Sequence, residues 1–217
     1  MKRLIVICEG QAEREFCQDV LRPFFASKGA ELSAPTIKHS NGGIVAWDTL
    51  KKQIVAHLHE QDAVVTMLID FYRIKDSFNY PGWMEAKQIA DPHRKMNHIF
   101  SKIADDMGEE YQRRFVPYIQ LHEFECLLFS DIKGLQYWFA KDECDYTKIQ
   151  KAISSFANPE EINNGANTAP SVRLLDAIHG YDKALYASVV AGIIGLATIR
   201  AKCPLFNEWL NRIEALI

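Results

Sequence analysis

Three short apolar segments, each ending next to an acidic residue, limit what this chain can fold into. Residues 3–8, 63–69 and 115–121 are mostly apolar or β-branched, without the alternation of a strand that faces water on one side. Such segments are typical of strands covered on both faces in a parallel sheet. Parallel neighbours need long crossover connections, so helices are expected between them.

The stretches between these segments carry helical signals. Residues 11–25 have apolar side chains four residues apart on one face, and Pro23 is expected to kink or end that helix. Residues 44–59 repeat apolar side chains at steps of three and four, and residues 83–107 are mostly helical with a restart at Asp91. A short strand around residues 35–38, a turn at Gly42–Gly43 and a loop over 71–83 complete the predicted layer.

Residues 131–217 have the pattern of helices separated by Gly, Asn and Pro, with no convincing strand. Helix starts are expected at residues 158–161 and 168–171, where a polar residue closely precedes a proline. Residues 184–199 form an uncharged run shorter than a bilayer span, and its glycines indicate a buried helix or two helices broken there. We therefore expect an α/β core over residues 1–130, with the helical portion packed on it.

Charge and cysteine content bear on which partners the protein can bind and in which cellular compartment it is expected. The formal net charge of −3 gives no overall attraction to a polyanion, so nucleic-acid binding would need a local basic face or bound metal ions. The five cysteines show no Cys-x-x-Cys spacing, which favours free thiols in a cytoplasmic protein. The apolar run near Met1 is too short for a signal peptide, and no membrane association is expected.

Acidic residues stand at the carboxyl ends of all three predicted strands. Glu9 and Asp70 follow the first two, and Glu123 or Glu125 follows the third. Functional groups of open parallel sheets collect at this edge, and carboxylate oxygens are the ligands that Mg²⁺ prefers. A single acid after a strand is more often only solvated, but three at one edge would repel one another without a metal or bound protons. Glu13 either joins them or is simply favoured by the helix dipole.

For several other polar residues the sequence allows more than one role. His122 could act as a base, contact a phosphate or orient a carboxylate, although such a histidine is more often structural. Arg173, Lys183 and Arg200 lie beside apolar runs and could contact phosphate; Arg200 could instead pair with an acid of the cluster or be a helix-terminal cation. Neither a Gly-rich phosphate loop nor a Gly-x-Ser-x-Gly elbow is present.

These motifs together resemble the Toprim-like domain-of-unknown-function family four-two-seven-six. The resemblance covers nearly the whole chain, and its most specific part is the His-Glu-Phe-Glu stretch at residues 122–125. The matching residues are Glu9, Gly10, Glu13, Asp70, His122 to Glu125, Tyr80-Pro81-Gly82, Thr168 to Ser171 with Arg173, Tyr181 with Lys183, and Ile199-Arg200 with Cys203 and Trp209.

The resemblance implies a fold, a chemistry and a partner. Toprim domains, found in topoisomerases, primases and nucleases related to the overcoming-lysogenization-defect proteins, bind Mg²⁺ at acidic strand ends and act on phosphodiesters. By resemblance, Glu9 is their leading glutamate and Asp70 the first aspartate of Asp-x-Asp. This sequence departs from the pattern at Tyr72, and Asp76 is too distant in sequence to be assumed a substitute. Family members are often encoded beside ATPases in bacterial defence loci, which implies an ATPase partner.

The leading hypothesis is a nuclease that hydrolyses DNA or RNA with Mg²⁺ or Mn²⁺. The alternative is a catalytically degenerate Toprim-like binding or regulatory subunit of an ATPase complex, which the missing second aspartate favours. Under the leading hypothesis the catalytic residues are Glu9, Asp70, His122 and Glu123, the metal ligands are Glu9, Glu13, Asp70, Glu123 and Glu125, and the phosphate contacts are Arg173, Lys183 and Arg200.

Overall fold

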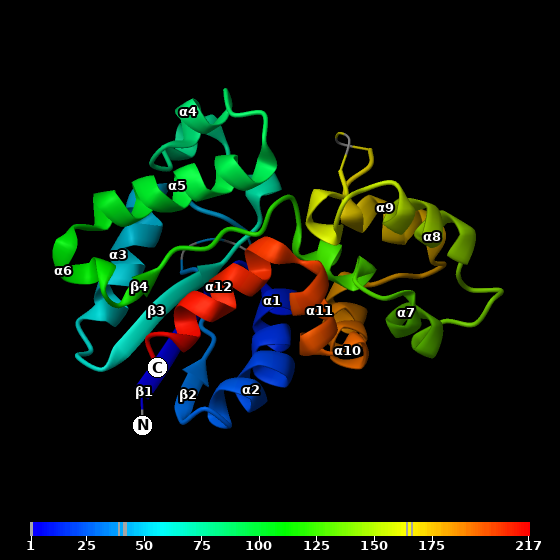
Figure 1. Ribbon diagram of the computed structural model, residues 1–217, viewed down its shortest axis with the longest axis horizontal. Helices are drawn as coiled ribbons and strands as arrows, with labels where there is room; N and C mark the ends of the chain where they lie inside the picture. Colours follow the sequence, from blue (N-terminus) through cyan, green and yellow to red (C-terminus); the bar gives the residue numbers. More distant parts are fainter. Residues whose placement is uncertain (1, 39, 41–42, 164, 166) are drawn as a thin grey trace.

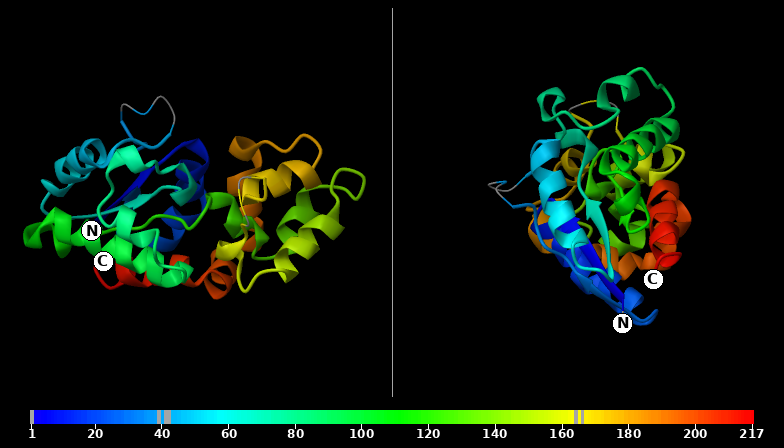
Figure 2. Two further views of the ribbon diagram at one scale, coloured as in Figure 1. Left: turned by 90° about the horizontal axis from the view of Figure 1, so that it is seen from above. Right: turned by 90° about the vertical axis from the view of Figure 1, so that its left-hand side faces the viewer.

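A computed structural model describes residues 2–38, 40, 43–163, 165 and 167–217. Seen from above, it has two parts that lie side by side, one with the sheet and one made of helices (Figure 2). The sheet has four strands, all parallel, in the order β2-β1-β3-β4. This arrangement confirms the α/β fold with a parallel sheet. The strands are β1 (Lys2–Cys8), β2 (Ala30–Ser33), β3 (Ala63–Leu68) and β4 (Phe115–Val116).

The two central strands follow the predicted pattern closely. Every residue of β3 is buried, as are the five residues of β1 from Leu4 to Cys8. Leu4 of β1 is in register with Leu32 of β2 and Val64 of β3. Helices cover both faces, which is why these strands lack polar alternation.

The two outer strands differ from their predicted positions. The strand expected at residues 35–38 is wrong: β2 lies at Ala30–Ser33, and only a bridge from Cys8 to Thr36 continues the pairing. The strand expected at 115–121 is reduced to the two residues of β4, because Pro117 has no N–H to give to a ladder. The chain stays near β3, however, and pairs again where Asp70 meets Gln120.

The first crossover is one continuous helical segment of three pieces. It comprises α1 (Gln11–Phe16), a π-helical turn η1 (Cys17–Leu21) and α2 (Arg22–Ala26). The π turn ends two residues before Pro23, whose missing N–H interrupts the regular α ladder, so the proline changes the helix without ending it.

The remaining crossover helices largely match the prediction. They are α3 (Trp47–Leu58), α4 (Trp83–Ala86), α5 (Pro92–Met107) and α6 (Glu109–Gln112). Asp91 caps α5 by accepting the N–H of Arg94 at 2.7 Å, which confirms the predicted restart. The loop after β3 contains two 3₁₀ turns, η2 (Phe71–Arg73) and η3 (Asp76–Phe78). The predicted turn at Gly42–Gly43 lies partly outside the described residues.

The second part begins with a 3₁₀ helix, η4 (Phe124–Phe129), where an apolar helix was expected. The described residues beyond 130 form no named strand, in agreement with the prediction, and both predicted helix starts, at residues 158–161 and 168–171, are confirmed. The elements that follow η4 are α7 (Ile132–Trp138), α8 (Tyr146–Ser154), η5 (Pro159–Glu161), α9 (Pro170–Ala177), α10 (Lys183–Ile194), α11 (Leu196–Lys202) and α12 (Pro204–Glu214).

The uncharged run at residues 184–199 lies in two helices, which is one of the two alternatives that the sequence predicts. Gly195, with φ of +83°, ends α10 and begins α11, and the two helices bend by 87°. Among the described residues, no single helix is long and apolar enough to cross a membrane, and α10 with α11 passes that test only as a bent pair.

Helix α12 returns from the helical part to the sheet (Figure 1). Its Trp209 stacks on Tyr118, with ring centroids 4.4 Å apart, and donates its indole N–H to the hydroxyl of Thr66 on β3 at 2.7 Å. The Thr66 hydroxyl donates in turn to the carbonyl of Val116 at 2.6 Å. These hydrogen bonds connect α12 to the central strand β3 and to the outer strand β4 through buried polar groups that all have partners.

Candidate functional site

Four buried acids gather at the carboxyl ends of β1 and β3. Glu9 follows β1, Asp70 follows β3, Glu13 lies in the first turn of α1, and Glu125 lies in η4. None of the four residues is more than 7% exposed, and Glu125 is fully buried. We call these four residues the acid cluster. Because charged carboxylates are rarely this buried without a partner, the cluster needs a cation.

Lys183 supplies that cation in this structure. Its ammonium lies 3.1 Å from Oε1 of Glu13, 3.1 Å from Oε2 of Glu125 and 3.7 Å from Oδ2 of Asp70. Asp182 caps α10 by accepting the N–H groups of residues 184 and 185, and Lys183 is therefore the first residue of that helix. The helical part of the chain thus provides the positive centre, and the strand ends provide the acids around it.

Backbone amides hold the other oxygens of three acids. Oε2 of Glu9 accepts the N–H of Asp70 at 2.9 Å, and Oε2 of Glu13 accepts the N–H of Gly10 at 3.0 Å. Oδ1 of Asp70 accepts the N–H of Phe124 at 2.8 Å. These three hydrogen bonds fix the carboxylates in orientation, so their free oxygens have little freedom to turn away from one another.

Glu125 is held differently from the other acids. Neither of its carboxylate oxygens accepts a hydrogen bond within the part of the chain that the structure describes, although both are buried. Oε2 is paired with the ammonium of Lys183 at 3.1 Å, so Oε1 is the oxygen without a partner among the described residues. The hydroxyl of Tyr181, close in sequence to Lys183, is likewise buried without a partner there. Buried acceptors without donors are costly, and they are what an incoming cation would satisfy.

The charges of the cluster act strongly on one another. Burial raises the pKa of Glu9, Asp70 and Glu125, and neighbouring carboxylates raise it further, whereas Lys183 lowers it. Burial alone would lower the pKa of Lys183, but Asp70, Glu125 and Glu13 outweigh it and raise that pKa, so the side chain stays an ammonium. The four acids of the cluster outnumber the two cations beside them, Lys183 and Arg73, so the site has an excess of carboxylates.

His122 and Glu123 lie outside this contact network. Oε2 of Glu123 accepts the N–H of Ser171 at the start of α9, at 2.9 Å. His122 has a left-handed backbone with φ of +67°, and its Nδ1 lies 3.3 Å from the side-chain nitrogen of Asn163. Burial lowers the pKa of His122 to about 4. Of the two alternatives, Glu123 or Glu125, the structure brings Glu125 into contact with the other acids through Lys183.

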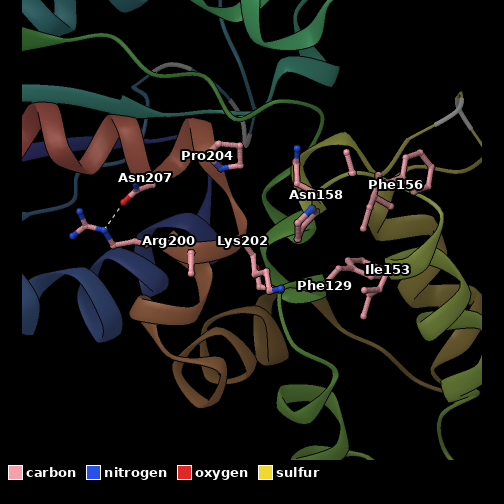
Figure 3. A pocket seen from close by; sticks show the side chains of 13 residues that line it. Phe129, Ile153, Phe156, Asn158, Arg200, Lys202, Pro204 and Asn207 are labelled. Atoms are coloured by element: carbon pink, nitrogen blue, oxygen red, sulfur yellow. Dashed lines mark hydrogen bonds between the residues drawn. The ribbon is translucent and has the colours of Figure 1, made fainter.

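Arg173 and Arg200 are not brought to the acid cluster either. Arg173 donates from Nε to the carbonyl of Thr168 at 2.8 Å, and its guanidinium lies 5.5 Å from the centre of the Phe156 ring. Arg200 pairs with Glu214 at 2.5 Å, an acid outside the cluster, and donates to Asn207 at 2.8 Å. Figure 3 shows Arg200 at the side of a separate cavity of about 730 Å³, which Lys202, Phe129 and Pro204 also line.

One cation near the acids has no counterpart in the sequence interpretation. Nε of Arg73 lies 3.8 Å from Oε1 of Glu9, and the Arg73 side chain is 59% exposed. It lines a cavity of about 390 Å³ that Glu9, Glu13, Gly43 and Lys183 also line. Arg73 follows Asp70 by three residues and lies in the stretch 71–83, for which the sequence predicts only a loop. The sequence signal that points to Arg73 is that it is the first basic residue after Asp70, the acid at the end of β3.

The donor set fits a hard divalent ion by its chemistry. Carboxylate oxygens are the preferred ligands of Mg²⁺, and Glu125 has two oxygens without hydrogen bonds. The geometry does not yet fit: across the described residues, no group of three His, Cys, Asp or Glu side chains is placed to hold a metal ion. Mg²⁺ binds oxygen at roughly 2.1 Å, whereas the acids stand 3.1 to 3.7 Å from the Lys183 ammonium.

Comparisons with known proteins add a family. A family model described as "Domain of unknown function (DUF4276)" matches residues 8–214, a range that holds the whole acid cluster, Arg73 and Lys183. Among solved structures, the C-terminal region of the Burkholderia pseudomallei OLD protein matches with 15% sequence identity and a TM-score of 0.44, over 100% of each chain. A search of curated proteins finds no match.

Proposed function

We propose that this chain, which belongs to the DUF4276 family as its motifs predict, is a Mg²⁺- or Mn²⁺-dependent phosphodiesterase that cleaves DNA or RNA. The observation that carries the proposal is the acid cluster itself: four buried carboxylates at the carboxyl edge of a parallel sheet, three in contact with Lys183 and the fourth, Glu9, beside the exposed Arg73. Burying four carboxylates against two cations carries a desolvation cost that these ion pairs offset only in part. A divalent ion would satisfy the carboxylates.

Glu9, Glu13, Asp70 and Glu125 are the residues that would hold metal. A bound ion would supply an activated water and neutralise charge that develops on the phosphate. The N–H groups of Asp70, Gly10 and Phe124 keep three of these carboxylates oriented before any ion arrives. Such preorganisation is what a metal site gains from a rigid sheet edge.

The Glu125 carboxylate takes the place of the acid that Tyr72 lacks. Tyr72 is 47% exposed and donates its backbone N–H to the carbonyl of His122 at 3.0 Å. Its side chain supplies no carboxylate, whereas Glu125 comes from η4 and reaches the same lysine as Asp70. We propose that the missing second aspartate is replaced in space by a residue from a different element.

Arg73 is the proposed phosphate contact at the mouth of the site. Its guanidinium is exposed, lies beside Glu9 and lines the same cavity as Lys183. Arginine binds phosphate oxygens through paired N–H donors, so this position suits a backbone phosphate next to the acids. Arg173 and Arg200, which are engaged elsewhere, have no such position.

Glu123 and His122 take supporting roles in this proposal. Glu123 binds the first turn of α9 and so fixes the helical part beside the acids. With a pKa of about 4, His122 is neutral at pH 7 and accepts a proton only weakly, which makes it a poor general base.

The test is a cleavage assay on the full chain. Labelled single- and double-stranded DNA and RNA are incubated with the protein and Mn²⁺ or Mg²⁺, and with EDTA as a blank. We expect metal-dependent cleavage that falls about 100-fold or more in Glu9→Gln. The control is Glu85→Gln, which changes an exposed glutamate and should leave the rate unchanged. Intact nucleic acid throughout, or full activity in Glu9→Gln, would overturn the proposal.

The second candidate is a binding or regulatory subunit of an ATPase complex. The absent acid at Tyr72 and the lysine inside the acid cluster favour it, since both would suit a site that no longer binds metal. This candidate predicts no Mn²⁺ binding by calorimetry and stable co-purification with an ATPase in the cytoplasm. A Mn²⁺ site in the acid cluster would count against it.

A further inference from the structure

We propose that Lys183 and a divalent ion exclude one another from the acid cluster, so that metal loading expels the lysine into the adjacent cavity. The inference rests on the proposed metal site and adds how that site is loaded. Lys183 is then a counter-ion built into the chain, which holds the acids together until an ion replaces it.

The first step is that both cations need the same place. The ammonium of Lys183 already contacts Glu13, Asp70 and Glu125, the acids that a metal would bind. The carboxylate oxygens that lie 3.1 to 3.7 Å from the ammonium are the same oxygens that an ion bound at this place would have as its nearest ligands. Two cations cannot share that space, because like charges a few ångströms apart repel strongly in a partly buried site.

The second step is that the lysine is free to move, whereas the acids are held. Glu9, Glu13 and Asp70 are each fixed by a backbone N–H. Lys183 has a flexible four-carbon stem, and its side chain is 35% exposed, against 0 to 3% for the acids that it contacts. The cavity of about 390 Å³ beside it offers room for the displaced ammonium.

Lys183 also balances charge in the metal-free protein. Without Lys183, the metal-free protein would bury carboxylates whose only cationic contact among the described residues is Arg73 beside Glu9. Lys183 therefore stabilises the metal-free fold and weakens metal binding by the same contacts, because an ion must break them. The released ammonium would line the cavity together with Arg73, which gives the loaded site a second cation for an anionic substrate.

A Mn²⁺ titration of charge variants tests the exchange. Lys183→Met keeps much of the length of the side chain and removes its charge; Lys183→Arg keeps the charge. We expect Lys183→Met to bind Mn²⁺ about tenfold tighter than wild type or more, and to melt at a lower temperature in EDTA. Lys183→Arg and the control Lys148→Met, at a lysine paired with Asp176 elsewhere, should bind like wild type. Unchanged or weaker Mn²⁺ binding in Lys183→Met would overturn the inference.

A second measurement uses wild-type protein and needs no variant to fold. Lysine amines are acylated in EDTA and in saturating Mn²⁺, and each lysine is quantified by peptide mass spectrometry. We expect labelling of Lys183 to rise several-fold with Mn²⁺, while Lys148 stays constant. If Mn²⁺ binds but labelling of Lys183 does not change, the exchange is wrong and the proposed function stands. If neither wild type nor Lys183→Met binds Mn²⁺, both are wrong.

Discussion

The ammonium of Lys183 lies 3.1 Å from a carboxylate oxygen of Glu125 that accepts no hydrogen bond from the described residues. The pair joins the start of α10 to η4 and closes the acid cluster on its helical side. Apart from this ion pair the buried Glu125 carboxylate accepts no hydrogen bond from the described residues, which leaves it available as a metal ligand.

Glu125→Gln should distinguish the role of Glu125 in the stability of the fold from its role as a metal ligand. Removing one buried charge relieves repulsion among the acids, so we expect the melting temperature in EDTA to stay the same or rise. Mn²⁺ affinity should fall about tenfold or more, because the ion loses a charged ligand. Calorimetry with Mn²⁺ and thermal melts check both, with Glu85→Gln as control. A lower melting temperature with unchanged Mn²⁺ affinity would show that Glu125 is structural.

Thr66→Val should destabilise the protein by about 1–3 kcal/mol. The substitution keeps the shape of the side chain but leaves the indole N–H of Trp209 buried without its acceptor. Urea denaturation followed by tryptophan fluorescence measures the loss. Thr147→Val, at an exposed position, should change the free energy of unfolding by no more than about 0.5 kcal/mol. Equal effects of the two substitutions would contradict the proposed link between α12 and the sheet.

Gly134→Ala should loosen the contact between α7 and α10. An added Cβ would lie 2.4 Å from Cγ1 of Ile194, so the Ile194 side chain or one of the two helices must shift, at a cost of about 1–3 kcal/mol. Gly192→Ala is the matched control, since nothing lies within 4 Å of its Cβ and alanine favours a helix by up to about 1 kcal/mol. We expect opposite signs in the free energy of unfolding. A stabilising Gly134→Ala would contradict the close packing.

His122 should make stability depend on pH. Burial lowers its pKa from an ordinary value of 6.5 to about 4, so between these values the unfolded chain binds more protons than the native one. The contribution is fully present above pH 6.5 and is lost as the pH falls toward 4. Its size is at most on the order of 3 kcal/mol.

The measurement is the free energy of unfolding of wild type and His122→Asn between pH 4 and 7.5. Asparagine tolerates the left-handed backbone at this position, so the fold should persist. The difference between the two proteins isolates His122 from the acids, whose raised pKa values act in the opposite direction. Parallel pH profiles would show that His122 does not titrate as its burial implies.

The sequence predicted the parts of the fold that depend on local patterns. Apolar runs gave the two central strands, and polar caps with proline gave helix starts at Asp91 and Asn158. Outer strands depended on partners instead: β2 moved to residues 30–33, and Pro117 shortened β4. The residues of a strand do not by themselves determine which neighbouring strand it pairs with.

The acids of the site were predictable, but their arrangement was not. Glu9 and Asp70 follow from strand ends at one edge of a parallel sheet. Lys183 reaches Asp70 from a helix more than 100 residues later in the sequence, and Glu123 accepts a hydrogen bond from Ser171 and does not join the cluster. Such long-range pairings depend on how the helical part packs, and no spacing within the sequence encodes that.

The most direct test of the metal centre is anomalous diffraction from a crystal soaked in Mn²⁺. We predict an anomalous peak within coordination distance of carboxylate oxygens from Glu9, Glu13, Asp70 or Glu125, with the Lys183 ammonium displaced from the acids. A fully soaked crystal with Mn²⁺ only at other sites, and Lys183 still in contact with Glu13 and Glu125, would contradict the account.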